Sequence, residues 1–153
     1  MSEKVVPAAG GDESQFHPRR SRGAQLSAEG TILEALDIDI VEATPDRVEL
    51  AMPIGPKVHQ PMGLLHGGAS AVMAETAASI GAYLNCDPAT EYAVGIELNI
   101  SHLRARSEGT VTAVGTPIRK GRAVHVWTVD VTDQDGVGVA TARCTLAIKK
   151  IQD

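Results

Sequence analysis

The chain has 153 residues, about the length of one domain, and a chain of this size can bury a full core without metal ions or disulfide bonds. Its formal net charge of -5 argues against a nucleic acid or an anionic membrane as a partner held by bulk electrostatic attraction. Hydrophobic residues make up 43% and aromatic residues only 3%, so we expect a core of Val, Ile, Leu and Ala.

The N-terminal end of the chain differs in composition from the rest. Residues 1–23 mix Gly, Pro, Ser and Arg without periodicity, and we expect a mobile N-terminal tail followed by a single domain over 24–153. The first residues lack the apolar segment of a signal peptide, and the two cysteines, Cys86 and Cys144, lack the CxxC spacing. These features indicate a reduced, cytoplasmic protein.

A short helix and a hairpin are predicted first. The segment "SAEGTILEALD" has a short helical pattern with Ser27 as its cap, and "VEATPDRVELAMPI" is typical of two strands joined by a turn at "TPDR". One face of the second strand is apolar throughout, with Val48, Leu50, Met52 and Ile54.

Residues 67 to about 85 predict one long helix, because they contain no proline and suffice for five turns. The helix is small or apolar on every face, so we expect it to be surrounded by protein. Glu75 is the one charged residue between Lys57 and Asp87, histidines apart. Its cost of about 2.5 to 3.5 kcal/mol on insertion scales argues against a membrane span. Because a buried carboxylate without a partner is rare, Glu75 is solvated at a cleft, paired or functional.

Four extended segments follow, joined by the glycine-containing turns "SEG", "RKG" and "DQDG", each with a Gly where a turn favours a positive φ. They cover residues 92–106, 110–118, 122–132 and 138–149. Hairpin connections make the sheet antiparallel. The economical arrangement is an α+β hotdog fold, in which the antiparallel sheet wraps around one long central helix.

The segment "HQPMGLLHGG" places Gln60 and His66 just before the helix and starts it with Gly67 and Gly68. Free N–H groups at such a helix start favour negative charge on a carbonyl oxygen. Glu75 lies eight residues past Gly67, about 12 Å along the axis. One helix therefore cannot bring both to the same carbonyl, and if they cooperate a twofold homodimer must supply Glu75 from a second copy.

A strand face that changes from apolar to cationic is predicted after the helix. Alternate residues are apolar and then basic: Val94, Ile96, Leu98, Ile100, His102, Arg104 and Arg106. In an acidic protein this is where a phosphate-bearing ligand would bind, since Arg suits phosphate through its two-pronged guanidinium. A solvated strand end is the alternative.

The segments "GLLHGGASAVMAE" and "VGIELNISHLRARSEGTV" resemble the hotdog-fold acyl-CoA thioesterases, in the branch with a helix-borne Glu. The chain is most similar to hydrolases of 1,4-dihydroxy-2-naphthoyl-CoA and to their paralogue that clears mischarged aryl carriers in enterobactin synthesis. The 4-hydroxybenzoyl-CoA thioesterase of the Arthrobacter type is a more distant relative. The resemblance covers about residues 35–149.

The resemblance implies a role for each site residue. The Gly67 N–H would polarise the thioester carbonyl with His66 and Gln60 alongside, and Glu75 of the other subunit would act as nucleophile or general base. Ser79 would help to hold the attacking water, although some relatives have Thr there. His102 and Arg104 would bind coenzyme A, with weaker candidates in Arg122, Lys149 and Lys150.

We therefore expect hydrolysis of acyl-CoA, with an aromatic acyl group, to free acid and coenzyme A. No cofactor is expected, and no metal, because HxxxH, HExxH and clustered cysteines are absent from the sequence. The expected assembly is a homodimer with shared sites, in a dimer of dimers (a homotetramer). Two alternatives stay open: a sensor that binds acyl-CoA without cleaving it, and a thioesterase for carrier-protein-bound aryl groups.

Overall fold

The computed structural model describes residue 26 and residues 28–151. The expected tail, the start of the domain at residue 24 and the predicted cap Ser27 lie outside this part. The elements are α1 (Ile32–Ala35), β1 (Asp39–Thr44), β2 (Arg47–Pro53), the 3-10 turn η3 (Pro56–Val58), α2 (Gly67–Leu84), β3 (Glu91–His102), β4 (Thr110–Lys120), β5 (Val124–Asp133) and β6 (Gly138–Lys150).

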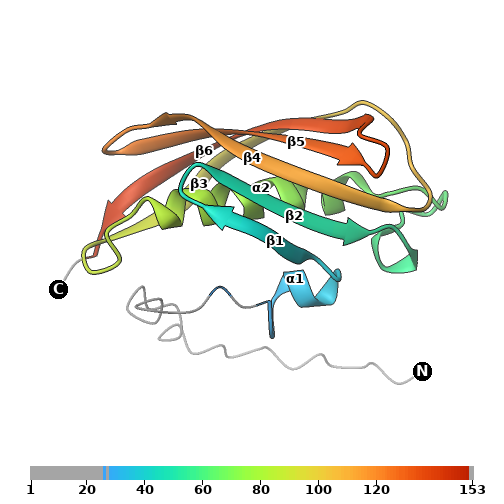
Figure 1. Ribbon diagram of the computed structural model, residues 1–153, viewed down its shortest axis with the longest axis horizontal. Helices are drawn as coiled ribbons and strands as arrows, with labels where there is room; N and C mark the ends of the chain where they lie inside the picture. The colour runs from blue at the N-terminus through green and yellow to red at the C-terminus, as the bar shows by residue number, and fades with distance from the viewer. Residues whose placement is uncertain (1–25, 27, 152–153) are drawn as a thin grey trace, which may run out of the picture.

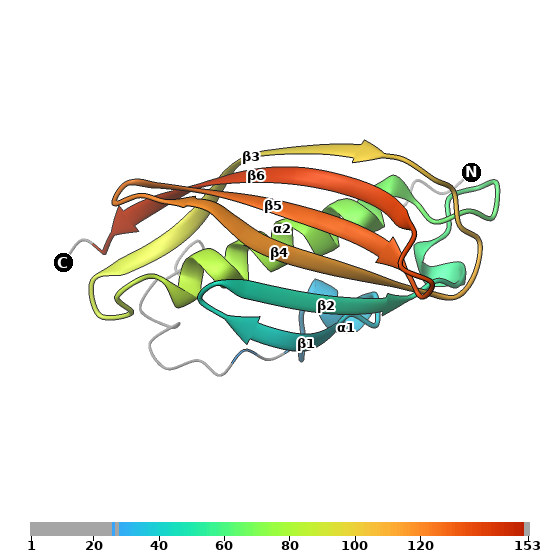
Figure 2. The same ribbon diagram turned by 45° about the horizontal axis from the view of Figure 1, so that its top comes forward.

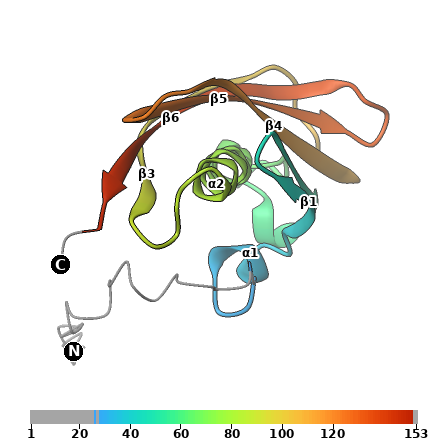
Figure 3. The same cartoon turned by 60° about the vertical axis from the view of Figure 1, so that its left-hand side comes forward.

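One antiparallel sheet of six strands curls around α2 (Figure 1). Its strand order is β1-β2-β4-β5-β6-β3, and every neighbouring pair is antiparallel. Viewed from the end, the strands form an arc over α2, and α1 lies on the open side of the arc (Figure 3). The predicted hotdog architecture is confirmed.

Two of the three predicted hairpins are confirmed, at "RKG" between β4 and β5 and at "DQDG" between β5 and β6. The hairpin predicted at "SEG" is wrong, because β3 pairs with β6 and is not a neighbour of β4. The glycines of the three connections also differ in conformation. Gly109 and Gly136 have φ values of 92° and 76°, the left-handed region that favours glycine. Gly121, in the "RKG" turn, does not have a positive φ, so that part of the prediction is wrong. Glycine is needed there for space instead, because a Cβ would lie 2.8 Å from the Val124 carbonyl oxygen.

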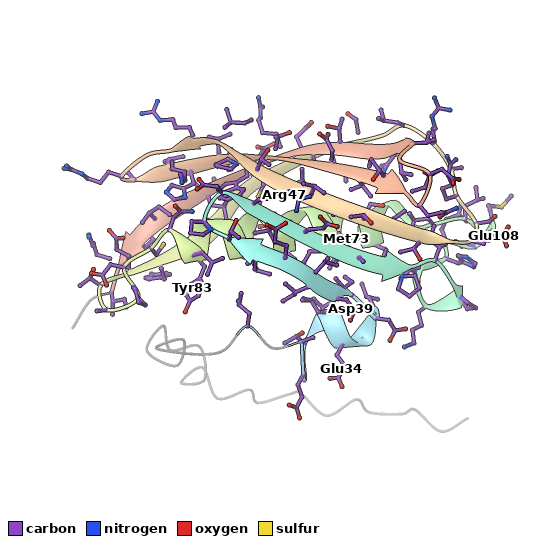
Figure 4. The ribbon with its side chains drawn as sticks, viewed as in Figure 1. Glu34, Asp39, Arg47, Met73, Tyr83 and Glu108 are labelled. Atoms are coloured by element: carbon purple, nitrogen blue, oxygen red, sulfur yellow. The ribbon has the colours of Figure 1, made fainter. Side chains whose placement is uncertain are left out.

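The core lies between α2 and the concave face of the sheet. Val48, Leu50 and Met52 of β2 are buried, as is Ile54 directly after the strand. Met73 of α2 lies in the interior, whereas Glu34 of α1 points outward (Figure 4). Small residues on α2 let the sheet approach closely. The ring of Trp127 occupies the position that a side chain at Gly81 would need.

One face of α2 is not covered by the residues that the structure describes. Five residues on this face are only half-buried: Ala71, Val72, Glu75, Thr76 and Ser79. The expectation that protein surrounds the helix on all sides therefore fails for the described part of a single chain. The uncovered face lies toward the gap in the arc between α1 and β3 (Figure 3).

The predicted apolar-to-cationic strand face is wrong in its geometry. A bulge between Gly95 and Glu97 shifts the register of β3, and the strand ends at His102 rather than at residue 106. Val94 and Ile96 are 41% and 60% exposed on an edge strand. Leu98 and Ile100 pack against the core.

Arg106 likewise does not continue that face. Its guanidinium binds the carboxylate of Asp133, with an Nη2 to Oδ2 distance of 2.6 Å, and Asp133 is buried. Arg106 therefore ties the segment after β3 to the end of β5. Among the described helices, none is long and apolar enough to cross a membrane.

Candidate active site

The start of α2 is held by the loop that precedes it. The His66 N–H donates to the Val58 carbonyl at 2.8 Å, and the Leu65 N–H donates to the Arg106 carbonyl at 2.7 Å. His66 is the N-cap residue, and its Nδ1 accepts a hydrogen bond of 2.8 Å from the Gly68 N–H. In its neutral form the His66 ring then carries its hydrogen on Nε2, which is available as a donor.

Gly67 presents a free backbone donor beside an imidazole. Within the described part of the chain, the Gly67 N–H has no acceptor, as expected for the first residue of a helix. A Cβ at Gly67 would lie 2.6 Å from His102 Nε2, so the ring of His102 sits directly against this glycine. A larger residue would have to displace His102.

A cavity of about 330 Å³ opens at this helix start. It brings together four residues predicted from sequence, two for the carbonyl and two for coenzyme A: Gln60, Gly67, His102 and Arg104. Apolar residues complete its walls, including Leu64, Leu65, Leu103 and Val139. An amide, a free N–H and two basic side chains around one opening are suited to a polar, negatively charged ligand.

Glu75 lies in a different hollow, on the uncovered face of α2. This cavity of about 390 Å³ is otherwise lined mainly by small and apolar residues: Ile32, Gly68, Ala71, Val72, Thr76 and Leu98. The two cavities share no lining residue. Within one chain, Gly67 and Glu75 therefore do not face the same space, and Ser79 lies one turn beyond Glu75 on the same half-exposed face.

The Glu75 carboxylate has one partner that the sequence analysis missed. Cys144 of β6 donates its thiol hydrogen to Glu75 Oε2, with a sulfur to oxygen distance of 3.2 Å. Burial, and then the hydrogen bond to Glu75, raise the pKa of the Cys144 thiol to about 12. The thiol is therefore protonated at neutral pH and acts as a donor. No pattern around Cys144 in the sequence indicated this contact.

A second missed contact involves Gly95 of β3. A Cβ at Gly95 would collide with Glu75 Oε1. This one had a signal in the sequence, because a glycine inside an apolar strand often marks the close approach of another group. The described residues include no cluster of three or more His, Cys, Asp and Glu that could hold a metal ion.

The weaker coenzyme A candidates lie far from His102 within the chain. Lys149 and Lys150 pair with the first residues of β3, whereas His102 is its last. A strand of 12 residues separates its ends by about 36 Å. Arg122 lies in the β4–β5 turn, at the same end as the C-terminus of β6 (Figure 2). One chain therefore does not combine these cations with His102 and Arg104.

The sequence profile of the thioesterase superfamily matches residues 62–140. The chain is 45% identical to the ComA2 protein of Bacillus subtilis over 120 residues, 78% of this chain and 95% of that protein. It is 40% identical to a 1,4-dihydroxy-2-naphthoyl-CoA hydrolase of Listeria monocytogenes, over 76% of this chain and 94% of the hydrolase.

Solved structures agree with these sequence matches. The crystal structure of a thioesterase from Haemophilus influenzae superposes with a TM-score of 0.78 at 32% sequence identity. The superposition covers 82% of this chain and 87% of the thioesterase. Both kinds of similarity extend over most of the described residues.

Proposed function

The chain belongs to the thioesterase superfamily and is a thioesterase, and from this premise we propose that it hydrolyses acyl-coenzyme A to a free acid and coenzyme A at sites shared by two subunits. The observation that carries the proposal is the placement of Glu75. Placing an ionisable side chain in a mainly apolar hollow costs free energy, because the charged group loses contact with water. Such a group is often a functional one, and a protein that only bound acyl-CoA would not need it.

The helix start supplies the electrophilic half of the mechanism. The thioester carbonyl oxygen accepts a hydrogen bond from the Gly67 N–H, and the positive end of α2 stabilises the charge that develops on it. Gln60 lines the cavity at this helix start. The imidazole of His66 caps the same end of the helix. These groups favour the transition state over the ground state because the charge on oxygen grows as the reaction proceeds.

Glu75 of the partner subunit supplies the second half, by one of two routes. As a general base it takes a proton from water, the water oxygen bonds to the carbonyl carbon, and the carbon–sulfur bond breaks to release the thiolate. As a nucleophile its oxygen bonds to the carbonyl carbon, the carbon–sulfur bond breaks to release the thiolate, and water then hydrolyses the resulting anhydride to the free acid and the Glu75 carboxylate. Ser79, one turn beyond, would hold the water in either route. Neither route needs a cofactor.

The edge of the sheet supports the homodimer. β3 is an edge strand of 12 residues with Val94 and Ile96 exposed, and such a strand is a ready surface for pairing with another. Antiparallel pairing of two copies about a twofold axis would cover these residues. A dimer of dimers, which we also propose on the family resemblance, would be tested by the mass of the native particle.

The substrate is proposed from the lining of the two cavities. The apolar walls of the Glu75 cavity, with Ile32, Val72 and Leu98, suit an aromatic acyl group, which the name of the Listeria hydrolase also suggests. The basic side chains of His102 and Arg104 suit the phosphates of coenzyme A. The free thiols of Cys86 and Cys144 fit the cytoplasm as the location.

A panel of aryl- and alkyl-CoA thioesters, with one aryl group loaded on a carrier protein, tests this function by thiol release. We expect turnover of aryl-CoA to be fastest, and Glu75→Gln should lower kcat by several decades while leaving substrate affinity near wild type. Glu49→Gln is a matched control, because Glu49 is a half-buried carboxylate paired with Arg47 on β2. Retained turnover in Glu75→Gln would refute the mechanism.

A further inference from the structure

Both oxygens of the Glu75 carboxylate contact the neighbouring strands β3 and β6. Oε2 accepts the thiol hydrogen of Cys144, at 3.2 Å from the sulfur. Oε1 lies against Gly95, and the three atoms closest to a Cβ built at Gly95 all belong to Glu75. The missing side chain at Gly95 therefore makes room for this carboxylate.

Cys144 is suited to hold the carboxylate rather than to react. It is 0% exposed on β6, so solvent does not compete for its thiol hydrogen. Its ladder neighbours are Trp127 on β5 and Leu98 on β3, and Leu98 closely follows the β3 bulge between Gly95 and Glu97. The bulge and the thiol lie on adjacent strands next to the same side chain.

The two oxygens differ in what they can still accept. Oε2 already receives the Cys144 hydrogen bond, whereas Oε1 receives none from the described residues. Glu75 also lines the cavity of about 390 Å³ on the uncovered face of α2, so a molecule in that cavity can approach its carboxylate. A lone pair on Oε1 is therefore free to take a proton from water or to attack a carbonyl carbon.

We propose that Cys144 and Gly95 form a seat for the Glu75 carboxylate, in which the thiol fixes Oε2 and leaves Oε1 as the reacting oxygen. The inference rests on the proposed function, in that Glu75 must be the catalytic carboxylate. Cys144 is then a positioning residue that acts through Glu75. Its role is to limit the rotamers of a side chain that stands in a wide apolar hollow, where no other described side chain binds it.

Removal of the thiol tests the first half of the seat. With benzoyl-CoA as the probe, Cys144→Ala should lower kcat about tenfold with little change in KM, because the substrate does not contact Cys144. Cys144→Ser should recover most of kcat, since a hydroxyl also donates. Cys86→Ala is the matched control: Cys86 is a second buried thiol, bonded to the Ala82 carbonyl at the end of α2, and its loss should leave kcat unchanged.

Addition of a methyl group tests the second half. Gly95→Ala forces Oε1 from its position, and a displacement of about 1 Å at a reacting atom costs about 100-fold in rate. We expect that loss in kcat with the melting temperature close to that of wild type, because the three atoms nearest to the new methyl group all belong to the Glu75 side chain, which can shift. Wild-type kcat in Gly95→Ala would overturn the seat.

A double variant separates failure of this inference from failure of the proposed function. If Glu75→Gln retains turnover, the mechanism given under the proposed function fails, because Glu75 is then not the catalytic carboxylate. If Glu75→Gln is inactive, two outcomes would refute only the seat. One is a wild-type kcat in Cys144→Ala, and the other is a kcat of Cys144→Ser no higher than that of Cys144→Ala. In the Glu75→Gln background, Cys144→Ala should have no further effect, and an additional tenfold loss would show that Cys144 acts on another group.

Discussion

Two inactive variants should restore activity when they are mixed, if the site is shared between subunits. Gln60→Ala/His66→Asn removes both side chains beside the helix start, and Asn at 66 keeps an N-cap for α2. Glu75→Gln removes the carboxylate. Gly67 and Glu75 lie about 12 Å apart along one helix and in separate cavities, so each site should take one half from each chain.

The expected magnitude follows from the symmetry. When equal amounts of the two variants exchange subunits at random, about half of the dimers are mixed, and each mixed dimer has one intact site out of two. Activity should therefore rise from near zero to about a quarter of the wild-type value per site. Thiol release from benzoyl-CoA measures it, and native mass spectrometry of tagged subunits verifies the exchange. Samples that exchange subunits and stay inactive would place the whole site in one chain.

Three other perturbations test separate parts of the structure. Arg104→Ala should raise KM for a coenzyme A thioester about tenfold and leave KM for a truncated thioester without the nucleotide unchanged. The difference should shrink with added salt. An equal rise in KM for both substrates would show that the phosphates bind elsewhere. Gly81→Ala should lower the free energy of unfolding in urea by about 1 to 3 kcal/mol, because Trp127 fills the space of the new methyl group; unchanged stability would contradict that packing. Burial, and then the charge of Lys120, lower the pKa of His125 in the folded protein. As the pH falls, His125 of the unfolded chain therefore takes up its proton before His125 of the folded chain does. The free energy of unfolding should fall as the pH drops below about 6.5 and level off below the folded-state pKa. Melting temperatures from pH 7.5 to 5.5 measure the last effect, and a His125→Gln variant with an equally steep decline would assign it to another group.

The features of the fold and site that were predicted correctly are set by residues close together in the sequence. The helix Gly67–Leu84 shows in the sequence because its interior has no proline and its composition is uniform. Gln60, His66 and Gly67 could be grouped because eight residues of chain connect them, and a loop of that length keeps them together. The turns at Gly109 and Gly136 have the left-handed conformation that glycine adopts without strain.

The parts that could not be predicted depend on register and on strand order. One extra residue at the bulge after Gly95 moves the following side chains to the other face, which the alternation of residue types alone does not reveal. Cys144 follows Glu75 by 69 positions, and it reaches the carboxylate only because β6 lies between β5 and β3 in the sheet. Strand order is a property of the whole fold, so no local pattern encodes this contact.

The same reasoning bears on the two groups of cations that one chain keeps apart. His102 ends β3, and Lys150, paired with Glu91, lies at its beginning, about 36 Å away. Full-length antiparallel pairing of two β3 strands about a twofold axis brings the beginning of one strand beside the end of the other. Lys150 of the partner subunit, on the strand beyond, would then lie at the same end of the paired sheet as His102. The proposed dimer, which would unite Glu75 with Gly67, would therefore also bring the two groups of cations closer together, and one twofold axis would account for both pairings.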